Sequence, residues 1–137
     1  MVDALGRARR WLKRGGCLID LRPAHTIPEV VIGTDKYARV VGVLTVEAER
    51  HQRHAAADRA LNHVLDRQLF VLEDAREFVF YRYADSAEEL RDHIAARWKQ
   101  TRLDDATCLR TAAALGNEAG ARLWLRERVA IRRLKPR

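Results

Sequence analysis

The chain opens with an amphipathic stretch that runs into two glycines and then into a short apolar segment. Apolar residues recur there at the spacing of one helical face, namely Leu5, Ala8 and Leu12. This spacing predicts a helix over residues 3–13, and the pair Gly15-Gly16 ends it because glycine adopts the left-handed conformation at low cost. The apolar run 17–21 predicts a buried strand. A helix that leads directly into a buried strand requires a sheet with helices packed against it.

The rest of the chain alternates strand and helix signals. In chain order, the predicted elements are strands 29–32 and 37–44 joined as a hairpin, a helix 46–68, a strand over 70–72 and 76–84, helices that begin near residues 86 and 104, and a strand 121–134. Bulky residues on both faces, such as Phe78 and Val79, predict that strand 76–84 is covered on both sides for much of its length. The sequence therefore predicts a single α+β domain over residues 1–137, with a mostly antiparallel sheet of four to five strands and helices packed on it.

The chain is strongly basic. It has 26 Lys and Arg against 19 Asp and Glu, a net charge of +7, and a pI near 10.1. Such a balance can indicate a polyanionic partner, either nucleic acid or an anionic surface. The alternative is a purely compositional origin, which we favour because the charge is spread along the chain and most of the basic residues are arginine.

The sequence carries no sign of membrane insertion or export. No apolar run approaches the ~18 residues that a membrane-spanning helix needs, and the basic N-terminus has no apolar segment of the secretory type. We therefore expect a cytoplasmic protein with no membrane contact. Cys17 and Cys108 lack the spacing of metal ligands, and we expect both to be reduced thiols.

The last predicted strand has one apolar and one cationic face. The residues of the cationic face are Arg122, Trp124, Arg126, Arg128 and Arg132. Arginines spaced along a strand beside an aromatic ring are suited to phosphates and stacked bases, so these five residues are candidates for polyanion binding. The alternative is that this face packs beneath a helix, where the arginine stems cover apolar surface and the guanidinium groups pair with carboxylates.

Four stretches of the sequence resemble a known family when they are taken in order. They are the opening helix with Gly15-Gly16 and its strand, the helix around Ala57-Asp58-Arg59-Ala60-Leu61, the strand-to-helix passage Phe78 to Leu90, and the closing strand Arg128 to Leu134. Together they resemble the C-terminal half of a class I S-adenosylmethionine-dependent methyltransferase. The resemblance implies a Rossmann-like parentage in which 17–21 matches the fifth strand and 128–134 the closing antiparallel strand.

The part of that family that binds the cofactor has no counterpart in this chain. Family members hold S-adenosylmethionine with a glycine-rich turn after the first strand and an acidic residue that ends the second strand. The chain has no G-x-G-x-x-G or G-x-G-x-G, and tight glycine turns are what allow backbone N–H groups to approach such a cofactor closely. Arg14 also stands where the family usually has proline. We therefore expect no cofactor, and we assign no cofactor-binding residue.

A half sheet has an unpaired edge. In the complete fold the strand matching 17–21 pairs with a fourth strand, and that neighbour is missing here. Its free N–H and C=O groups form a template for another chain, unless the N-terminal helix or the hairpin covers them. We therefore expect a homodimer through the exposed sheet edge, with a separate protein partner as the alternative.

Two groups of residues are weak candidates for chemical sites. His25 follows the first strand and lies close in sequence to Asp20, so the pair could act in general base catalysis. The alternative is a loop histidine beside a structural Asp–Arg pair. His51, His54 and Asp58 share one helix face at a spacing that could hold a divalent metal, although a solvated polar face has the same pattern.

Three hypotheses for function follow. The first is a methyltransferase-like half-domain, non-catalytic by itself, that dimerises or binds a partner. The second is a subunit of a split methyltransferase whose partner supplies the cofactor half. The third is an arginine-rich nucleic-acid-binding protein. The sequence leaves enzymatic activity undecided and favours none for the isolated chain.

Overall fold

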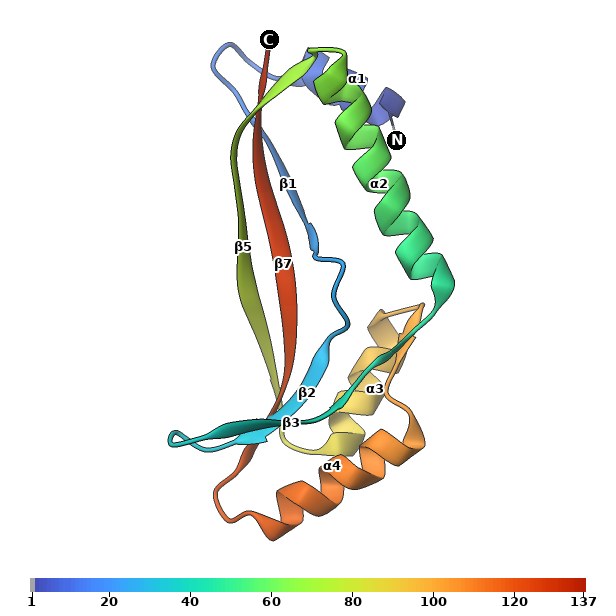
Figure 1. Ribbon diagram of the computed structural model, residues 1–137, viewed down its shortest axis with the longest axis vertical. Coiled ribbons are helices and arrows are strands. Elements are labelled where there is room, and N and C mark those ends of the chain that lie inside the picture. The colour runs from blue at the N-terminus through green and yellow to red at the C-terminus, as the bar shows by residue number, and fades with distance from the viewer. Residues whose placement is uncertain (1) are drawn as a thin grey trace. The chain divides into compact units, whose positions relative to one another are not determined.

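The computed structural model describes residues 2–137, with side chains from residue 4 onward, and is drawn in Figure 1. In this range the elements are α1 (Val2–Trp11), β1 (Leu18–Pro23), β2 (Glu29–Gly33), β3 (Ala38–Val43), β4 (Thr45–Val46), α2 (Ala48–Asp66), β5 (Phe70–Ala84), α3 (Ala87–Arg97), β6 (Thr101–Arg102), α4 (Asp105–Asn117) and β7 (Arg122–Pro136). The predicted α+β class with a mostly antiparallel sheet is confirmed. The two-residue strands β4 and β6, which pair with each other, were not predicted.

The main sheet has five strands and is organised around β7. Its strand order is β1-β7-β2-β3, and β5 also pairs with β7. β1 is antiparallel to β7, with Leu18 opposite Leu134 and Pro23 opposite Val129. β2 is antiparallel to the first part of β7 and to β3, so the hairpin predicted from the valine-rich runs is confirmed.

The chain divides into two compact units, each made of separate chain segments. Unit 1 comprises Met1–His25, His51–Phe78 and Val129–Arg137, and unit 2 comprises Thr26–Arg50 and Val79–Arg128. Each unit has its own apolar core. Since such a unit is defined by its contacts and not by independent folding, the interpretation of residues 1–137 as one domain stays a prediction.

The core of unit 1 lies between helices and one face of the sheet. Its fully buried members are Leu61, Val64, Phe70 and Leu134, and Leu5, Leu12 and Leu18 pack against them. The inward face of α2 carries Ala57, Ala60, Leu61 and Val64, all of which are buried. The helical face that we predicted for α1 thus packs on the sheet.

The core of unit 2 lies between β2, β7 and the helices α3 and α4. It contains Val30, Ile32, Leu90, Ile94, Leu123 and Leu125, all at most 2% exposed. The Ser86 hydroxyl accepts a hydrogen bond from the Glu89 N–H at 3.1 Å, which caps the N-terminus of α3. The Glu89 carboxylate accepts from the Asp85 N–H instead of the Ser86 N–H that a capping box would use.

Two predictions about strand burial are wrong. β1 alternates between half-buried and exposed residues, with Ile19 and Leu21 about half exposed, because α1 and α2 cover only the side chains of the other face. Residues 71–81 of β5 are all exposed, although we predicted strand 76–84 to be covered on both faces. Among the strands of residues 2–137, β5 pairs only with β7, so a long edge of the sheet has no strand partner.

Gly42 on β3 marks a close approach to α4. A Cβ at this position would collide with the methyl group of Thr107, a buried residue whose N–H and hydroxyl both donate to Asp104. We expect Gly42→Ala to lower the free energy of unfolding by about 1–3 kcal/mol, as overpacking does elsewhere. Gly116→Ala is the control, since nothing lies within 4 Å of its added Cβ, and it should leave stability equal or higher. Urea denaturation measures both variants, and equal effects would contradict the close packing of β3 on α4.

Candidate functional site

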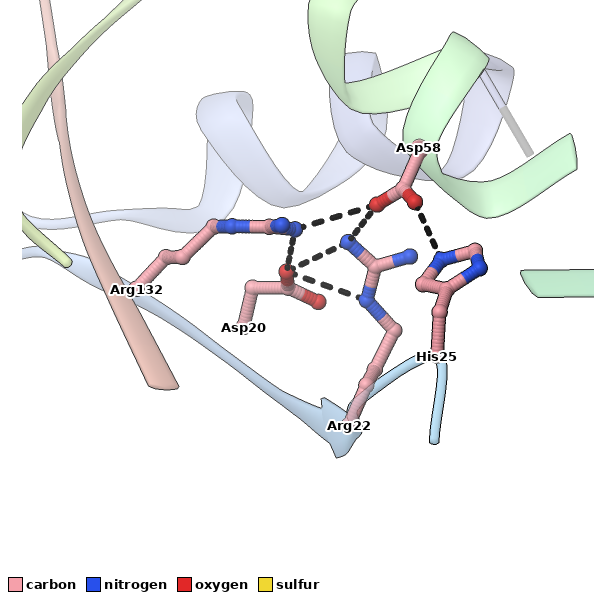
Figure 2. Close-up of polar contacts among 5 residues, drawn as sticks. All are labelled: Asp20, Arg22, His25, Asp58 and Arg132. Carbon is pink, nitrogen blue, oxygen red and sulfur yellow. Dashed lines mark hydrogen bonds and ion pairs between the residues drawn. The ribbon is translucent and has the colours of Figure 1, made fainter. Parts of the chain in front are cut away.

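A cluster of five charged or titratable side chains lies in unit 1 (Figure 2). Asp20 and Arg22 are two residues apart on β1, so their side chains point to the same face of the strand. Arg132 lies directly opposite Asp20 in the β1–β7 ladder. Asp58 enters from α2, and His25 from the loop that follows β1. We call this group the Asp58 cluster.

Asp58 links the members of the cluster. One of its oxygens accepts from Arg22 at 3.0 Å and from Arg132 at 3.1 Å, and the other lies 2.6 Å from His25 Nε2. Asp20 accepts two further hydrogen bonds from Arg22, at 2.7 and 3.0 Å, and one from Arg132 at 3.3 Å. Two guanidinium groups are therefore shared between two carboxylates.

The shared charges shift two pKa values. Burial raises the pKa of the Asp58 carboxyl, but the hydrogen bonds from Arg132 and His25 and the charges of both arginines outweigh it, so the pKa is lowered overall. Burial has the opposite effect on Arg22 and lowers its pKa. The contacts of Arg22 with Asp20 and Asp58 outweigh burial and raise this pKa above its ordinary value. Both pKa shifts favour the charged forms of Asp58 and Arg22.

A small cavity of about 140 Å³ adjoins the cluster. Besides cluster members it is lined by Pro23, Ala24, His54, Glu77 and Ala130. The ring of His54 meets the ring of His25 edge to face, with centroids 5.4 Å apart. His25 is about half exposed, and its hydrogen bond to Asp58 fixes the orientation of the imidazole. This arrangement can hold a histidine in place next to solvent.

The predicted pair of His25 and Asp20 lies within this cluster, but the two side chains are not bonded to each other. His25 pairs with Asp58, which lies 33 residues further along the chain. Sequence reasoning identified Asp58 only as a metal candidate and missed its role as the centre of an ion-pair network. The D-x-R pattern of Asp20 and Arg22 was the available signal, since it places opposite charges on one face of a strand.

The candidate metal residues His51, His54 and Asp58 are engaged separately. Asp58 contacts two arginines and His25, the ring of His54 meets that of His25 edge to face, and His51 is exposed. Within the described part of the chain, no group of three or more His, Cys, Asp or Glu side chains is arranged to hold a metal ion.

The predicted cationic strand face is divided between the two units and is largely paired with carboxylates. Arg132 belongs to the Asp58 cluster in unit 1. In unit 2, Arg126 pairs with Glu29 at 2.6 Å, and Arg122 lies 4.0 Å from Asp35. These pairs agree with one part of the alternative interpretation, namely that the arginines pair with carboxylates of the same chain.

The remaining members of that face lie beside aromatic residues of β5. The ring of Trp124 lies 6.0 Å from that of Tyr83, and Arg128 lines a cavity of about 390 Å³ together with Tyr81 and Arg126. The tyrosines of β5 were not predicted to contribute to this face, because their strand was expected to be covered.

Comparison of the chain with protein-family models, with curated protein sequences and with solved structures finds no match. No helix in the described residues is long and apolar enough to cross a membrane.

Proposed function

We propose that the chain is a non-catalytic module that self-associates, and that it forms a homodimer by pairing β5 with β5 of a second copy. The single observation that supports this most is the long edge strand, which is exposed along residues 71–81 and pairs only with β7 among the described strands. An unpaired row of N–H and C=O groups is a template for another strand. The dimer interface is thus placed at β5, whereas the sequence predicted it at the strand 17–21.

The side chains of β5 supply apolar surface for such an interface. Those that remain 40–66% exposed are Val71, Leu72, Phe78, Val79, Phe80, Tyr81 and Tyr83. Aromatic side chains bury about 150–250 Å² each, so the four half-exposed rings offer roughly 400 Å² in total. The three aliphatic residues and the backbone add to this area, which approaches the ~800 Å² per partner of a standard interface.

The charge pattern of β5 favours a second copy as the partner. When a two-fold axis relates two antiparallel edge strands, even-numbered residues lie opposite even-numbered residues, and odd-numbered residues lie opposite odd-numbered ones. In the register centred on Phe78, Asp74 of each copy lies opposite Arg82 of the other copy, which gives two such pairs. No like charges lie opposite each other in this register. Registers centred on the neighbouring residues 74–77 and 79 each place like charges face to face, which destabilises strand pairing.

The resemblance to the C-terminal half of a class I methyltransferase is part of this proposal. It is supported by the order of the opening helix, the Gly15-Gly16 turn and β1, and by a closing strand β7 that is antiparallel to β1. The proposal assigns no chemical step to this chain. The Asp58 cluster, with two arginines shared between two carboxylates, is then a structural network that joins α2 to the sheet.

A charge exchange along β5 tests the proposal. In size-exclusion chromatography with light scattering at micromolar concentration, we expect the wild type at twice its mass of 15.7 kDa. Asp74→Arg places an arginine opposite Arg82 of the other copy in both pairs, and Arg82→Asp places an aspartate opposite Asp74. Because like charges then face each other, each variant should be a monomer. The double variant Asp74→Arg/Arg82→Asp restores opposite charges and should be a dimer again.

Asp66→Arg serves as the matched control, because Asp66 is exposed at the end of α2 and lies outside the edge strand β5. It changes the charge equally and should remain dimeric. A monomeric wild type, or a double variant that stays monomeric while its circular dichroism is unchanged, would refute pairing through β5 in this register.

A further inference from the structure

The net positive charge of the chain belongs entirely to unit 1. Unit 1 contains 14 Lys and Arg against 7 Asp and Glu, whereas unit 2 contains 12 of each. The arginines of β7 that sequence analysis singled out therefore lie mostly in the neutral unit. A site for a polyanion should be sought where the charge excess lies.

Part of this excess is gathered around one cavity of unit 1. The cavity has a volume of about 320 Å³ and lies between the end of α1, the Gly15-Gly16 turn and the end of β7. Six of its lining residues are cationic, namely Arg9, Arg10, Lys13, Arg14, Lys135 and Arg137, and none is acidic. This set is called the basic pocket below.

Several cations of the basic pocket are available for a ligand. Arg10, Lys13 and Arg14 are exposed, and none of the ion pairs among residues 4–137 includes them. Arg9 donates to the backbone oxygen of Arg137 at 2.7 Å, and its buried Nε has no hydrogen-bond partner among the described residues. Lys135 is shared with Glu73 at 3.4 Å. Among the described residues, Arg10, Lys13 and Arg14 are therefore the pocket cations that keep their hydrogen-bond donors for a ligand.

We infer that the basic pocket binds the phosphate backbone of single-stranded nucleic acid. Guanidinium groups bind phosphate oxygens in a bidentate manner, and six cations around one cavity fit a chain of phosphates better than one small anion. Trp11 lies between two pocket cations in the sequence and is 80% exposed at the end of α1, where an unpaired base can stack on its ring.

The packing of α1 argues against a membrane surface as the ligand. A helix that lies on a bilayer inserts its apolar face among the lipids. Leu5 of α1, and Leu12 just after it, are instead packed against the core of unit 1. Among the described side chains of this segment, the exposed cations and Trp11 are left to meet a partner, and single-stranded nucleic acid requires this combination.

Fluorescence anisotropy with a labelled single strand of about 20 nucleotides tests the inference. Between about 50 and 200 mM NaCl, log K should fall with a slope of roughly −0.7 for each phosphate contacted, or about −4 for six cations. The triple variant Arg10→Glu/Lys13→Glu/Arg14→Glu should bind at least about tenfold more weakly at low salt, with a slope shallower by about 2. Trp11→Ala should weaken binding about tenfold with the slope unchanged.

The matched control is Arg97→Glu/Lys99→Glu/Arg102→Glu, which makes the same charge change at three exposed residues of unit 2. It should bind nearly as well as the wild type, and an equal loss would show that only net charge matters, which would overturn the inference. Failure of the wild type to bind the oligonucleotide, or binding only to vesicles rich in phosphatidylserine, would overturn it as well. Light scattering on the same samples keeps this test separate from dimerisation, since the triple variant leaves β5 intact.

Discussion

Glu127→Leu is expected to lower the free energy of unfolding by about 3–5 kcal/mol. Glu127 accepts a hydrogen bond from Arg50 at 2.7 Å, and both side chains are nearly buried, at 9% and 12% exposure. Arg50 also donates to Thr101 at 3.0 Å and lies over the ring of Trp98. The substitution removes the counterion and leaves the guanidinium group desolvated, which is why the loss should exceed that of an ordinary surface pair.

The double variant Arg50→Met/Glu127→Leu distinguishes the penalty of leaving Arg50 buried without a counterion from the net contribution of the Arg50–Glu127 pair to stability. Removing both charges leaves apolar side chains of similar size, so most of the lost stability should return. Urea denaturation followed by circular dichroism measures all three proteins. A single variant that unfolds at the wild-type midpoint, or a double variant less stable than Glu127→Leu, would contradict the buried pair as described.

Asp58→Asn is expected to destabilise the protein at neutral pH by about 1–3 kcal/mol, because Arg22 and Arg132 keep Asp20 as a counterion but lose Asp58. The same variant should change the acid sensitivity. The pKa of Asp58 is lower in the folded protein than its ordinary value of 3.8, so the unfolded chain binds the proton first. The stabilisation by Asp58 is therefore complete above pH 3.8 and is lost as the pH falls from there through the lowered pKa.

Denaturation curves between pH 7 and pH 2 measure this effect. The wild type should lose stability over that acid range more steeply than Asp58→Asn, and the two stabilities should converge at the acid end. Asp66→Asn, on the same helix but outside the cluster, should follow the wild type throughout. Parallel curves for the wild type and Asp58→Asn would rule out Asp58 as a stabilising carboxylate.

The elements of the fold could be predicted from local sequence patterns. Helical spacing identified α1 and α2, and turn residues between β-branched runs identified the β2–β3 hairpin. Burial could not be predicted in the same way, because it depends on which distant segment covers a strand. Phe78 and Val79 are apolar residues of the kind found in covered strands. Both are nevertheless exposed, because β5 pairs only with β7 among the described strands.

The candidate site could be predicted only in part for the same reason. His25 and Asp20 were identified because they are close in sequence. The partner of His25 is Asp58, 33 residues away, and Arg132 meets Asp20 only through strand pairing across 112 residues. The basic pocket likewise joins residues 9–16 to residues 135–137, and no spacing rule connects these segments.

The division of the chain has a consequence for synthesis on the ribosome. Unit 2 has all of its residues once Arg128 has been made, whereas unit 1 needs the segment Val129–Arg137. Leu134, which is fully buried in the core of unit 1, and Arg132, which neutralises Asp20 and Asp58, are both in that segment. The core of unit 1 is therefore complete only after this segment has been synthesised. A nascent chain that stalls before it would expose Leu61 and Phe70 to chaperones and proteases.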